Sequence, residues 1–508
     1  MTHIARSTFI IAIFFAVDKV LGFARQILIG RQFGLSRELD AFNTANNLPD
    51  LLFALISGGA LAIAVIPVLS EWIEREGRPA AWDVFSRVAN LFFLVTALLA
   101  VVIAIFAGPL VRSQIGLAPG FTPSQQVLVA ELMRLNLVAT LIFSLSGLVM
   151  AGLQANQHFL LPAMAPALYN VGQIFGAVIL APQHGYRIGP ISLPAFGLGV
   201  HGLVYGVILG ALLHLSIQLP GLLRYKFRWT SAINLRHPGL VQVLGLMGPR
   251  LITMLFIQLI QVGRDNFASR LAPGSVTALT YGWFIMQVPE TLIGTAIATA
   301  LLPTLAEQIT RGDRDQYRQT INRALRTILA LTIPAAALMA VSIRPVIQFA
   351  FHFDDAGIDM VAWATRAFLL GLMAQAMFEV VARSFYARQN ARTPLLTAGF
   401  RLGMFLLFSF LLVKPLGAPG IALADTIAIS SETAVLLFLL NRTDPGILKV
   451  GFTFARVVPG SLVGAAIVYL IMTTIHLHVL ILAAGALAIG GVVLLPFIWP
   501  EAKLLVRL

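Results

Sequence analysis

The chain contains no cysteine and few charged residues. Without cysteine it can form no disulfide, no catalytic thiolate and no zinc or iron–sulfur site with cysteine ligands. Only 11% of its 508 residues are charged, whereas soluble domains carry about 25%. The chain has fewer acidic than basic residues, 22 Asp and Glu against 35 Lys and Arg, and its mean hydropathy is +0.87. This composition argues against a water-soluble multidomain enzyme and predicts a polytopic helical membrane protein.

Long apolar runs, interrupted by charges, glycine and proline, predict an all-α fold with about 14 transmembrane helices. Their approximate limits are 7–30, 41–69, 88–111, 127–152, 159–182, 193–219, 239–268, 274–306, 324–350, 361–386, 394–413, 418–440, 457–475 and 478–500. The first run resembles a secretory signal peptide, but it has no small-residue cleavage site and continues through Asp18 and Lys19. We therefore expect it to be retained as a span.

The basic residues are distributed unevenly between the loops on the two sides of the membrane. With this span order, 21 of the 35 Lys and Arg residues fall on the side of the termini, 7 on the other side and 7 within spans. Cytoplasmic loops carry the excess of Lys and Arg in membrane proteins. The asymmetry predicts that both termini lie in the cytoplasm, and it explains the net charge of +13 without nucleic acid.

Two pairs of segments indicate an internal repeat. The stretch from Pro49 to Glu71 resembles that from Pro289 to Glu307, and Ala155–Pro162 resembles Ala387–Pro394. Six spans per repeat would make the halves parallel, an arrangement typical of alternating-access transporters. The predicted parts are an N-terminal lobe at 1–235, a C-terminal lobe at 236–445 and two extra helices at 446–508.

Several predicted spans contain charged residues, which are costly in a bilayer. The first span carries Asp18, Lys19 and Arg25, Asp40 opens the second span, and the seventh contains Arg250, Arg264 and Asp265. One interpretation is a cationic, water-filled cavity that accepts an anionic substrate, and the other is internal salt bridging that holds helices together. Three further cations near span ends are expected to reach the membrane interface: Arg134, Arg366 and Arg401.

Other chemistries find little support in the sequence. No phosphate-binding loop or His-Glu-x-x-His zinc motif is present, so we expect no ATP hydrolysis, no catalytic residues and no metal site. Asp354, Asp355 and Asp359 resemble the acidic motifs of membrane transferases, but we expect them in a solvated outer loop.

Five motifs together resemble one family over residues 10–440. They are Lys19-Val-Leu-Gly22-Phe-Ala-Arg25, Asp40-Ala41-Phe42…Pro49, Gly58-Gly59-Ala60…Ile66-Pro67, Pro162-Ala163…Pro166…Asn170, and Phe385-Tyr386-Ala387-Arg388-Gln389…Thr393-Pro394. The chain is similar in these motifs to the MurJ (MviN) lipid II flippases of the multidrug/oligosaccharidyl-lipid/polysaccharide exporter superfamily. The resemblance implies two six-helix lobes and a further helix pair that forms a groove for a polyprenyl tail. It also implies an undecaprenyl-diphosphate-linked peptidoglycan precursor as substrate and a multi-pass location in the bacterial cytoplasmic (inner) membrane.

The resemblance places Lys19, Arg25 and Asp40 at cavity positions, with Asp18 beside them and Arg250 and Arg264 as additional cations. The chain departs from the family at Asp50, at Phe53 and at Phe284, since many members have Asn at the first of these positions and Arg at the other two. Asp265 falls where some members have a sodium ligand, and Thr426 is its one companion in span 12.

We therefore predict a lipid II flippase, not an enzyme, that works by alternating access without a cofactor. Its energy would come from the membrane potential or from coupling to Na⁺ or H⁺. The expected partners are lipid II, membrane lipids and cell-wall synthesis proteins. Three alternatives remain: an exporter of another polyprenyl-linked glycan or a cation-coupled drug exporter of the same fold, a membrane-bound transferase, and a scaffold for cell-wall enzymes.

Overall fold

The computed structural model describes the backbone of residues 3–57, 59–475 and 479–505, and the side chains of 13–55, 64–187, 189–190, 192–247, 251–475, 482–501 and 503. The chain divides into two compact units, Met1–Arg270 and Leu271–Leu508. This boundary follows the seventh predicted span. The lobes predicted at 1–235 and 236–445 were defined by the internal repeat, and that division stays a prediction.

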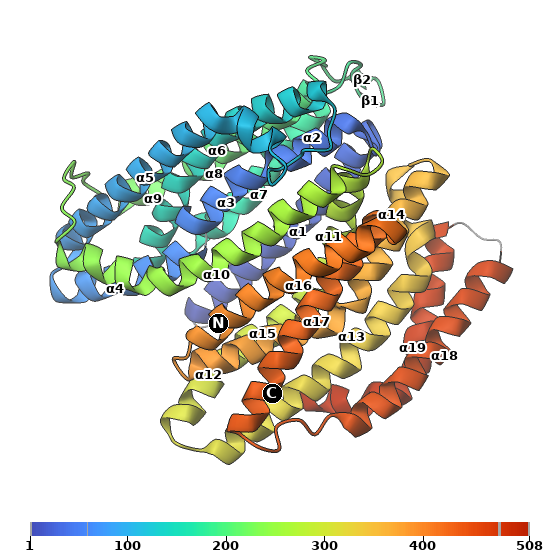
Figure 1. The fold of residues 1–508 in the computed structure, drawn as a ribbon. Helices are drawn as coiled ribbons and strands as arrows, with labels where there is room; N and C mark the ends of the chain where they lie inside the picture. The colour runs from blue at the N-terminus through green and yellow to red at the C-terminus, as the bar shows by residue number, and fades with distance from the viewer. Residues whose placement is uncertain (1–2, 58, 476–478, 506–508) are drawn as a thin grey trace. The chain divides into compact units, whose positions relative to one another are not determined.

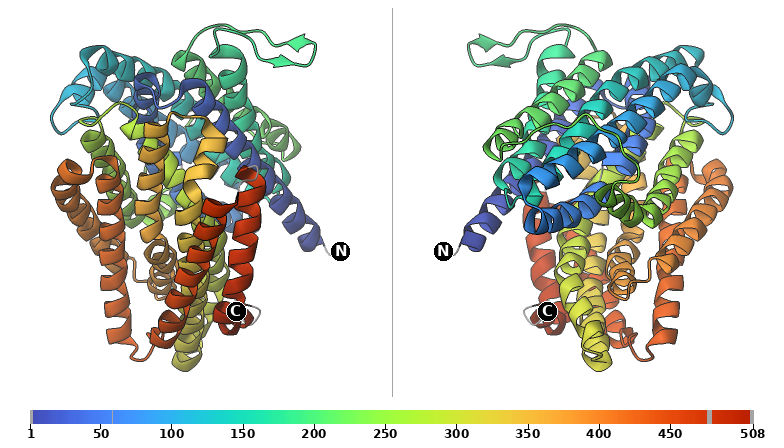
Figure 2. Two further views of the ribbon diagram at one scale, coloured as in Figure 1. Left: turned by 90° about the vertical axis from the view of Figure 1, so that its right-hand side faces the viewer. Right: turned by 90° about the vertical axis from the view of Figure 1, so that its left-hand side faces the viewer.

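The first unit is a bundle of helices with one short hairpin (Figure 1). Its elements are α1 (His3–Phe33), α2 (Arg37–Ala45), α3 (Asn47–Leu52), η1 (Phe53–Ser57), α4 (Gly59–Arg75), α5 (Arg78–Arg112), α6 (Pro123–Ala155), α7 (Leu160–Phe175), η2 (Gly176–Leu180), β1 (Arg187–Ile188), β2 (Ile191–Ser192), α8 (Val200–Ser216), α9 (Leu219–Arg224) and α10 (Pro238–Ala268). The antiparallel strands β1 and β2 extend beyond the helices of this unit (Figure 2).

Local sequence explains how the long helices of this unit begin and what they bury. Thr122 caps α6 in a reciprocal pair with Gln125, and Pro123 at the first helical position needs no hydrogen bond from its nitrogen. The apolar core lies between α4, α5 and α6, where Trp82, Phe85 and neighbouring aliphatic side chains are buried.

The second unit comprises the remaining helices. They are α11 (Ser275–Glu290), η3 (Thr291–Thr295), α12 (Ala296–Thr310), α13 (Arg314–Phe351), α14 (Asp355–Leu370), α15 (Leu372–Ala387), α16 (Arg392–Leu416), α17 (Ala418–Thr443), α18 (Gly451–Thr474) and α19 (Val479–Leu505). The last two pack on each other and along α13 (Figure 1). They correspond to the predicted extra pair.

Two of the predicted spans are broken in the same way. The span predicted at 41–69 consists of α2, α3, η1 and α4, and the π-helical turn η1 follows Pro49. In the second unit the π-helical turn η3 follows Pro289. Proline lacks the backbone donor of a regular helix and disturbs the turn around it. Each of these prolines is one that the internal repeat aligns.

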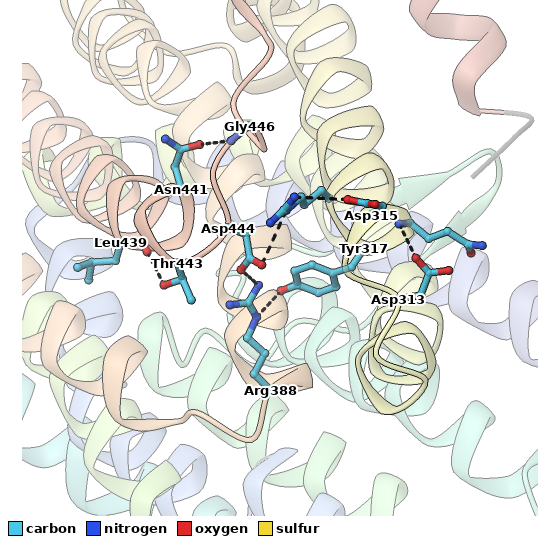
Figure 3. Close-up of polar contacts among 11 residues, drawn as sticks. Asp313, Asp315, Tyr317, Arg388, Leu439, Asn441, Thr443, Asp444 and Gly446 are labelled. Atoms are coloured by element: carbon cyan, nitrogen blue, oxygen red, sulfur yellow. Dashed lines mark hydrogen bonds and ion pairs between the residues drawn. The ribbon is translucent and has the colours of Figure 1, made fainter.

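Polar contacts fix the connection between α17 and α18. Arg388 forms an ion pair with Asp444, its Nε donates to Tyr317 Oη at 2.9 Å, and its guanidinium lies over the Tyr317 ring (Figure 3). Ile447 lies three residues after Asp444. Its carbonyl accepts from Asn322 Nδ2 at 2.7 Å, and the Ile447 side chain is buried. The connection is thereby anchored on α13 and at the end of α15.

A second ionic cluster joins α18 and α19 to α13. Glu501 of α19 is fully buried and pairs with Arg326 of α13 at 2.8 Å and with Arg456 of α18. Thr453 donates to the same carboxylate at 2.9 Å. A buried carboxylate is tolerated when cations and donors surround it, so Glu501 ties the helix pair to the lobe.

The predicted all-α membrane fold is confirmed. Among the described residues, 10 helices are long and apolar enough to cross a membrane, or up to 12 if each of two bent pairs is one span. Two further predicted spans, 7–30 and 41–69, are occupied by α1 and by the broken helix α2–α4. The count of 14 stays a prediction.

Candidate functional site

A polar cluster joins α1 to α7 in the first unit, and Asn170 is its centre. Arg25 Nη1 donates to Asn170 Oδ1 at 2.9 Å, while Asn170 Nδ2 donates to Asp18 Oδ1 at 2.8 Å and to the Asp18 carbonyl at 3.3 Å. Asn170 is buried. One amide therefore orients the guanidinium and the carboxylate of two residues that lie two helical turns apart on one face of α1.

Lys19 completes this cluster on its open side. Its Nζ lies 4.0 Å from Asp18 Oδ2, and 57% of its side chain is exposed against 20% for Asp18. Lys19 also stacks over the Phe15 ring at 5.0 Å. Lys19 is therefore the most accessible described cation of the cluster. An exposed ammonium on a flexible side chain can turn toward a ligand.

Sequence reasoning did not identify Asn170 as a site residue. It is part of the motif Pro162-Ala163…Pro166…Asn170, but a single asparagine in an apolar span can equally be a structural side chain. The available signal was its position four residues after Pro166, whose carbonyl accepts from Asn170 Nδ2 at 3.4 Å.

Asp40 lies deeper than the α1 charges. It belongs to the first turn of α2, which Ser36 caps by accepting from the Leu39 backbone nitrogen, and only 1% of Asp40 is exposed. A carboxylate near a helix N-terminus is stabilised by the helix dipole. The position of Asp40 therefore fits a residue that stabilises the N-terminus of α2. A direct contact of Asp40 with a substrate stays a prediction.

Arg264 and Asp265 form a second polar cluster, on α10. Arg264 Nε lies 3.3 Å from Asp265 Oδ1, and Asn47 Nδ2 of α3 donates to Asp265 Oδ2 at 2.6 Å. Asp265 is 1% exposed and Arg264 is 9% exposed. The guanidinium of Arg264 is thus already paired with its neighbour. The side chain of Arg250 lies outside the described residues.

The two departures from the family pattern in the broken second span differ in their surroundings. Asp50 is exposed, and its carbonyl accepts from Gln258 Nε2 of α10 at 3.2 Å. Phe53 packs edge-on against Phe143, which in turn packs against Tyr169 at 4.9 Å. Tyr169 directly precedes Asn170 on α7. At Phe53, where many family members have arginine, this chain therefore has an aromatic contact that extends to the neighbour of Asn170.

In the second unit, Thr426 donates to the Ala367 carbonyl at 2.7 Å and ties α17 to α14. The residue directly before Thr426, Asp425, belongs to an ionic group that the sequence did not predict. Arg401 of α16 is buried, with Nη2 3.1 Å from Asp425 and Nη1 3.8 Å from Glu432. The prediction that Arg401 reaches the membrane interface is wrong, because α17 supplies two carboxylates inside the bundle.

The other two cations expected near span ends bond to neighbouring carbonyls. Arg134 Nε donates to the Ala104 carbonyl at 2.9 Å, and Arg366 Nε donates to the Ala340 carbonyl at 2.8 Å. Both bonds link adjacent helices, α6 to α5 and α14 to α13. Arg134 is therefore a membrane-span cation whose described contact lies outside the α1–α7 cluster.

The acidic group at the start of α14 has a structural explanation. Asp354 caps the helix by accepting from the Gly357 backbone nitrogen, and Arg344 pairs with Asp359 at 2.6 Å and Asp355 at 3.3 Å. In the part of the chain that the structure describes, no group of three or more His, Asp or Glu side chains is placed to hold a metal ion. These contacts account for all three aspartates without a transferase site.

With this geometry in view, comparison with known proteins identifies the family. The family model "Lipid II flippase MurJ" matches residues 29–492. The chain belongs to this family. A MurJ family member is a transporter and not an enzyme, so that prediction is confirmed along with the family resemblance.

MurJ proteins from several bacteria are similar along most of the chain. The lipid II flippase MurJ of Burkholderia cenocepacia is 30% identical over 482 residues, which cover 92% of this chain and 90% of that protein. The probable lipid II flippase MurJ of Buchnera aphidicola is 26% identical over 431 residues, covering 84% and 81%. The match therefore spans more than four fifths of each protein in both cases.

Solved structures show the same fold. One titled lipid II flippase MurJ, inward closed conformation, superposes with a TM-score of 0.79 at 23% identity and covers 98% of this chain and 99% of its own. A multidrug resistance MATE family transporter of the MOP superfamily reaches a TM-score of 0.69 at 17% identity, covering 85% and 96%. The chain is thus a multi-pass membrane protein with the MurJ fold.

Proposed function

We propose that this protein moves lipid II, the undecaprenyl-diphosphate-linked peptidoglycan precursor, from the inner to the outer leaflet of the bacterial cytoplasmic membrane. Transport proceeds by alternating access, with both termini in the cytoplasm. The observation that carries this proposal is the family match over residues 29–492, which includes the two broken spans and the α7 part of the polar cluster.

The α1–α7 cluster supplies the chemistry for a diphosphate. Arg25 presents a guanidinium, which suits phosphate oxygens because its donors form a planar fork. Asn170 of α7 holds that guanidinium, and Asp18 balances its charge. Lys19 lies at the exposed edge and adds a mobile second cation. Substrate oxygens would compete with Asp18 for these cations.

The energy for the cycle comes from the membrane potential or from a Na⁺ or H⁺ gradient, since the sequence contains no ATP-binding loop. Moving one charge through 100 mV releases about 2.3 kcal/mol, enough to bias a cycle of conformations. Proteins of cell-wall synthesis that make or use lipid II are the expected partners.

The proposal is tested first by competitive binding. The purified protein is mixed with lipid II, undecaprenyl phosphate and an anionic phospholipid, and bound lipid is identified by native mass spectrometry. We expect selective lipid II binding that Arg25→Ala abolishes. Arg134→Ala is the matched control, because it also removes a membrane-span arginine and lies outside the cluster.

Translocation is then measured with the same variants in proteoliposomes that contain a fluorescent lipid II analogue. Wild type and Arg134→Ala should transfer the analogue between leaflets, and Arg25→Ala should not, although it remains folded. Full transfer by Arg25→Ala would disprove the cluster mechanism. Equal binding of lipid II and phospholipid by the wild type would instead point to another lipid-linked glycan or a drug.

A further inference from the structure

A buried carboxyl group lies at the break of the kinked helix in the second unit. The segment α11–η3–α12 forms one candidate membrane span, Ser275–Thr310, and Glu290 is the last residue of α11 before the π-helical turn. Only 7% of Glu290 is exposed. The carboxyl therefore lies inside the helix bundle near the middle of a span, where little water can solvate a charge.

The direct partners of Glu290 are uncharged hydroxyl groups from the turn itself. Thr295 Oγ1 lies 3.0 Å from Oε1, and Thr291 Oγ1 lies 3.4 Å from Oε2. A hydroxyl group can donate or accept a hydrogen bond. The two threonine hydroxyls can therefore donate to an ionised carboxylate. Alternatively, Thr291 can accept from the O–H of a protonated carboxyl.

Helix α15 places a second acid beside this group. Glu379 forms an ion pair with Arg383 on α15, and Arg383 Nη2 also donates to Thr299 Oγ1 at 3.3 Å. These two are the charged residues that act on Glu290. Among the described side chains of α12, α13, α14 and α17, which also pack on this segment, none adds a charge that does so.

The charges do not balance in this region. One guanidinium faces two carboxyl groups, and it is engaged by Glu379 of its own helix. An uncompensated carboxylate inside a membrane protein is unfavourable, and taking up a proton removes its charge. By contrast, the buried carboxylates of Glu501 and Asp425 each contact an arginine directly.

We propose that Glu290 is a proton-binding residue whose protonation is linked to the bending of the α11–η3–α12 span. In the described conformation the carboxyl carries a proton taken from water. When the span opens at η3, the group meets water, the proton leaves, and the carboxylate remains. The link to transport rests on the proposed function, whereas proton binding itself does not.

The close contact between η3 and α15 explains why bending and protonation are linked. A side chain at Gly294 would meet the Ala376 Cα at 2.8 Å and Glu290 Oε1 at 3.2 Å, so glycine allows the turn to lie directly on α15. Any movement of the turn away from α15 therefore changes the surroundings of Glu290. Single π-helical turns of this kind are often found at functional sites.

Infrared difference spectroscopy of the full-length protein tests proton binding directly, because a protonated carboxyl has a carbonyl band that carboxylates lack. We expect the wild type to show this band at neutral pH and Glu290→Gln to lose it. Glu307→Gln is the control, since Glu307 lies on α12 of the same span but is exposed and paired with Arg311. Absence of the band in the wild type, or its persistence in Glu290→Gln, would overturn the proposal.

Proteoliposomes then test the link to transport. An imposed pH gradient should change the rate of lipid II transfer in wild type and Glu307→Gln but not in Glu290→Gln, while lipid II binding is retained in all three. If the rate of lipid II transfer by the wild type does not depend on the pH gradient, the link to transport is overturned. If the wild type does not transfer lipid II at all, the proposed function fails, and the infrared result still decides proton binding.

A second variant covers the case in which Glu290→Gln does not fold. Glu290→Asp keeps the carboxyl but withdraws it from the two threonines. The band should persist with a changed frequency and a changed pH midpoint. A spectrum identical to that of the wild type would show that the band arises elsewhere and would overturn the proposal.

Discussion

At the scale of single residues, the arrangement around Asn170 decides what the charges of α1 can do. Its side chain accepts from Arg25 and donates to Asp18, so two ionic groups of one helix are held by one amide of another. Because an amide is uncharged, its hydrogen bond orients the Arg25 guanidinium without itself neutralising the charge.

This arrangement predicts that Asn170→Ala weakens lipid II binding. A hydrogen bond to a charged group contributes about 1.5–3 kcal/mol, so the dissociation constant should rise by about 10-fold or more. Native mass spectrometry or a fluorescent-lipid titration measures the change. Asn156→Ala is the control, since Asn156 also accepts from an arginine, Arg78, at 3.2 Å outside the cluster. An equal loss in both variants would indicate general destabilisation.

At the scale of helices, small residues let α7 and η2 approach α8 at backbone contact. A Cβ added at Gly172 would lie 2.4 Å from the Gly210 Cα, and one at Gly176 would lie 2.6 Å from the Gly206 Cα. Membrane helices gain stability from such close packing because the lipid itself is as apolar as the side chains. The contact positions α7, and with it Asn170, against the rest of the first unit.

Gly172→Ala should therefore destabilise the protein, because the added methyl group meets backbone that cannot move aside. Overpacking costs about 1–3 kcal/mol, which should appear as a lower midpoint of thermal unfolding in detergent. Gly245→Ala on α10 is the control, since nothing lies within 4 Å of its Cβ position. That variant should gain about 0.5–1 kcal/mol from helix propensity. Equal midpoints for both variants would contradict the packing argument.

At the scale of the whole molecule, the loop charges imply one orientation in the membrane. The 21 basic residues on the side of the termini predict that the α4–α5 connection lies in the cytoplasm and the α5–α6 connection outside. The lack of cysteine makes this orientation easy to test, because a single introduced thiol is the only one in the chain.

We predict that Ser113→Cys is labelled by a membrane-impermeant maleimide in intact spheroplasts, whereas Glu76→Cys is labelled only after permeabilisation. Both residues are exposed and lie at the two ends of α5. The reverse pattern would place the termini outside and contradict the predicted topology.

The fold class and the family were predictable from the sequence because both depend on local features. Hydropathy, prolines and loop charges are read within a window of about 20 residues. The contacts of the candidate site were predicted less well. Asn170 was not identified, and Arg401 was expected at the interface although it is paired with Asp425 and Glu432.

By itself, the sequence determined that the protein is a helical membrane protein with charged residues in its apolar runs, since partition into a bilayer depends on local composition, and its motifs indicated the transporter family. Only the tertiary structure decided which of these charges are already paired. Arg25 and Asn170 are 145 positions apart in the chain. Whether such groups meet depends on how the helices pack, and a buried charge in a low-dielectric interior is governed by the partners that packing brings to it.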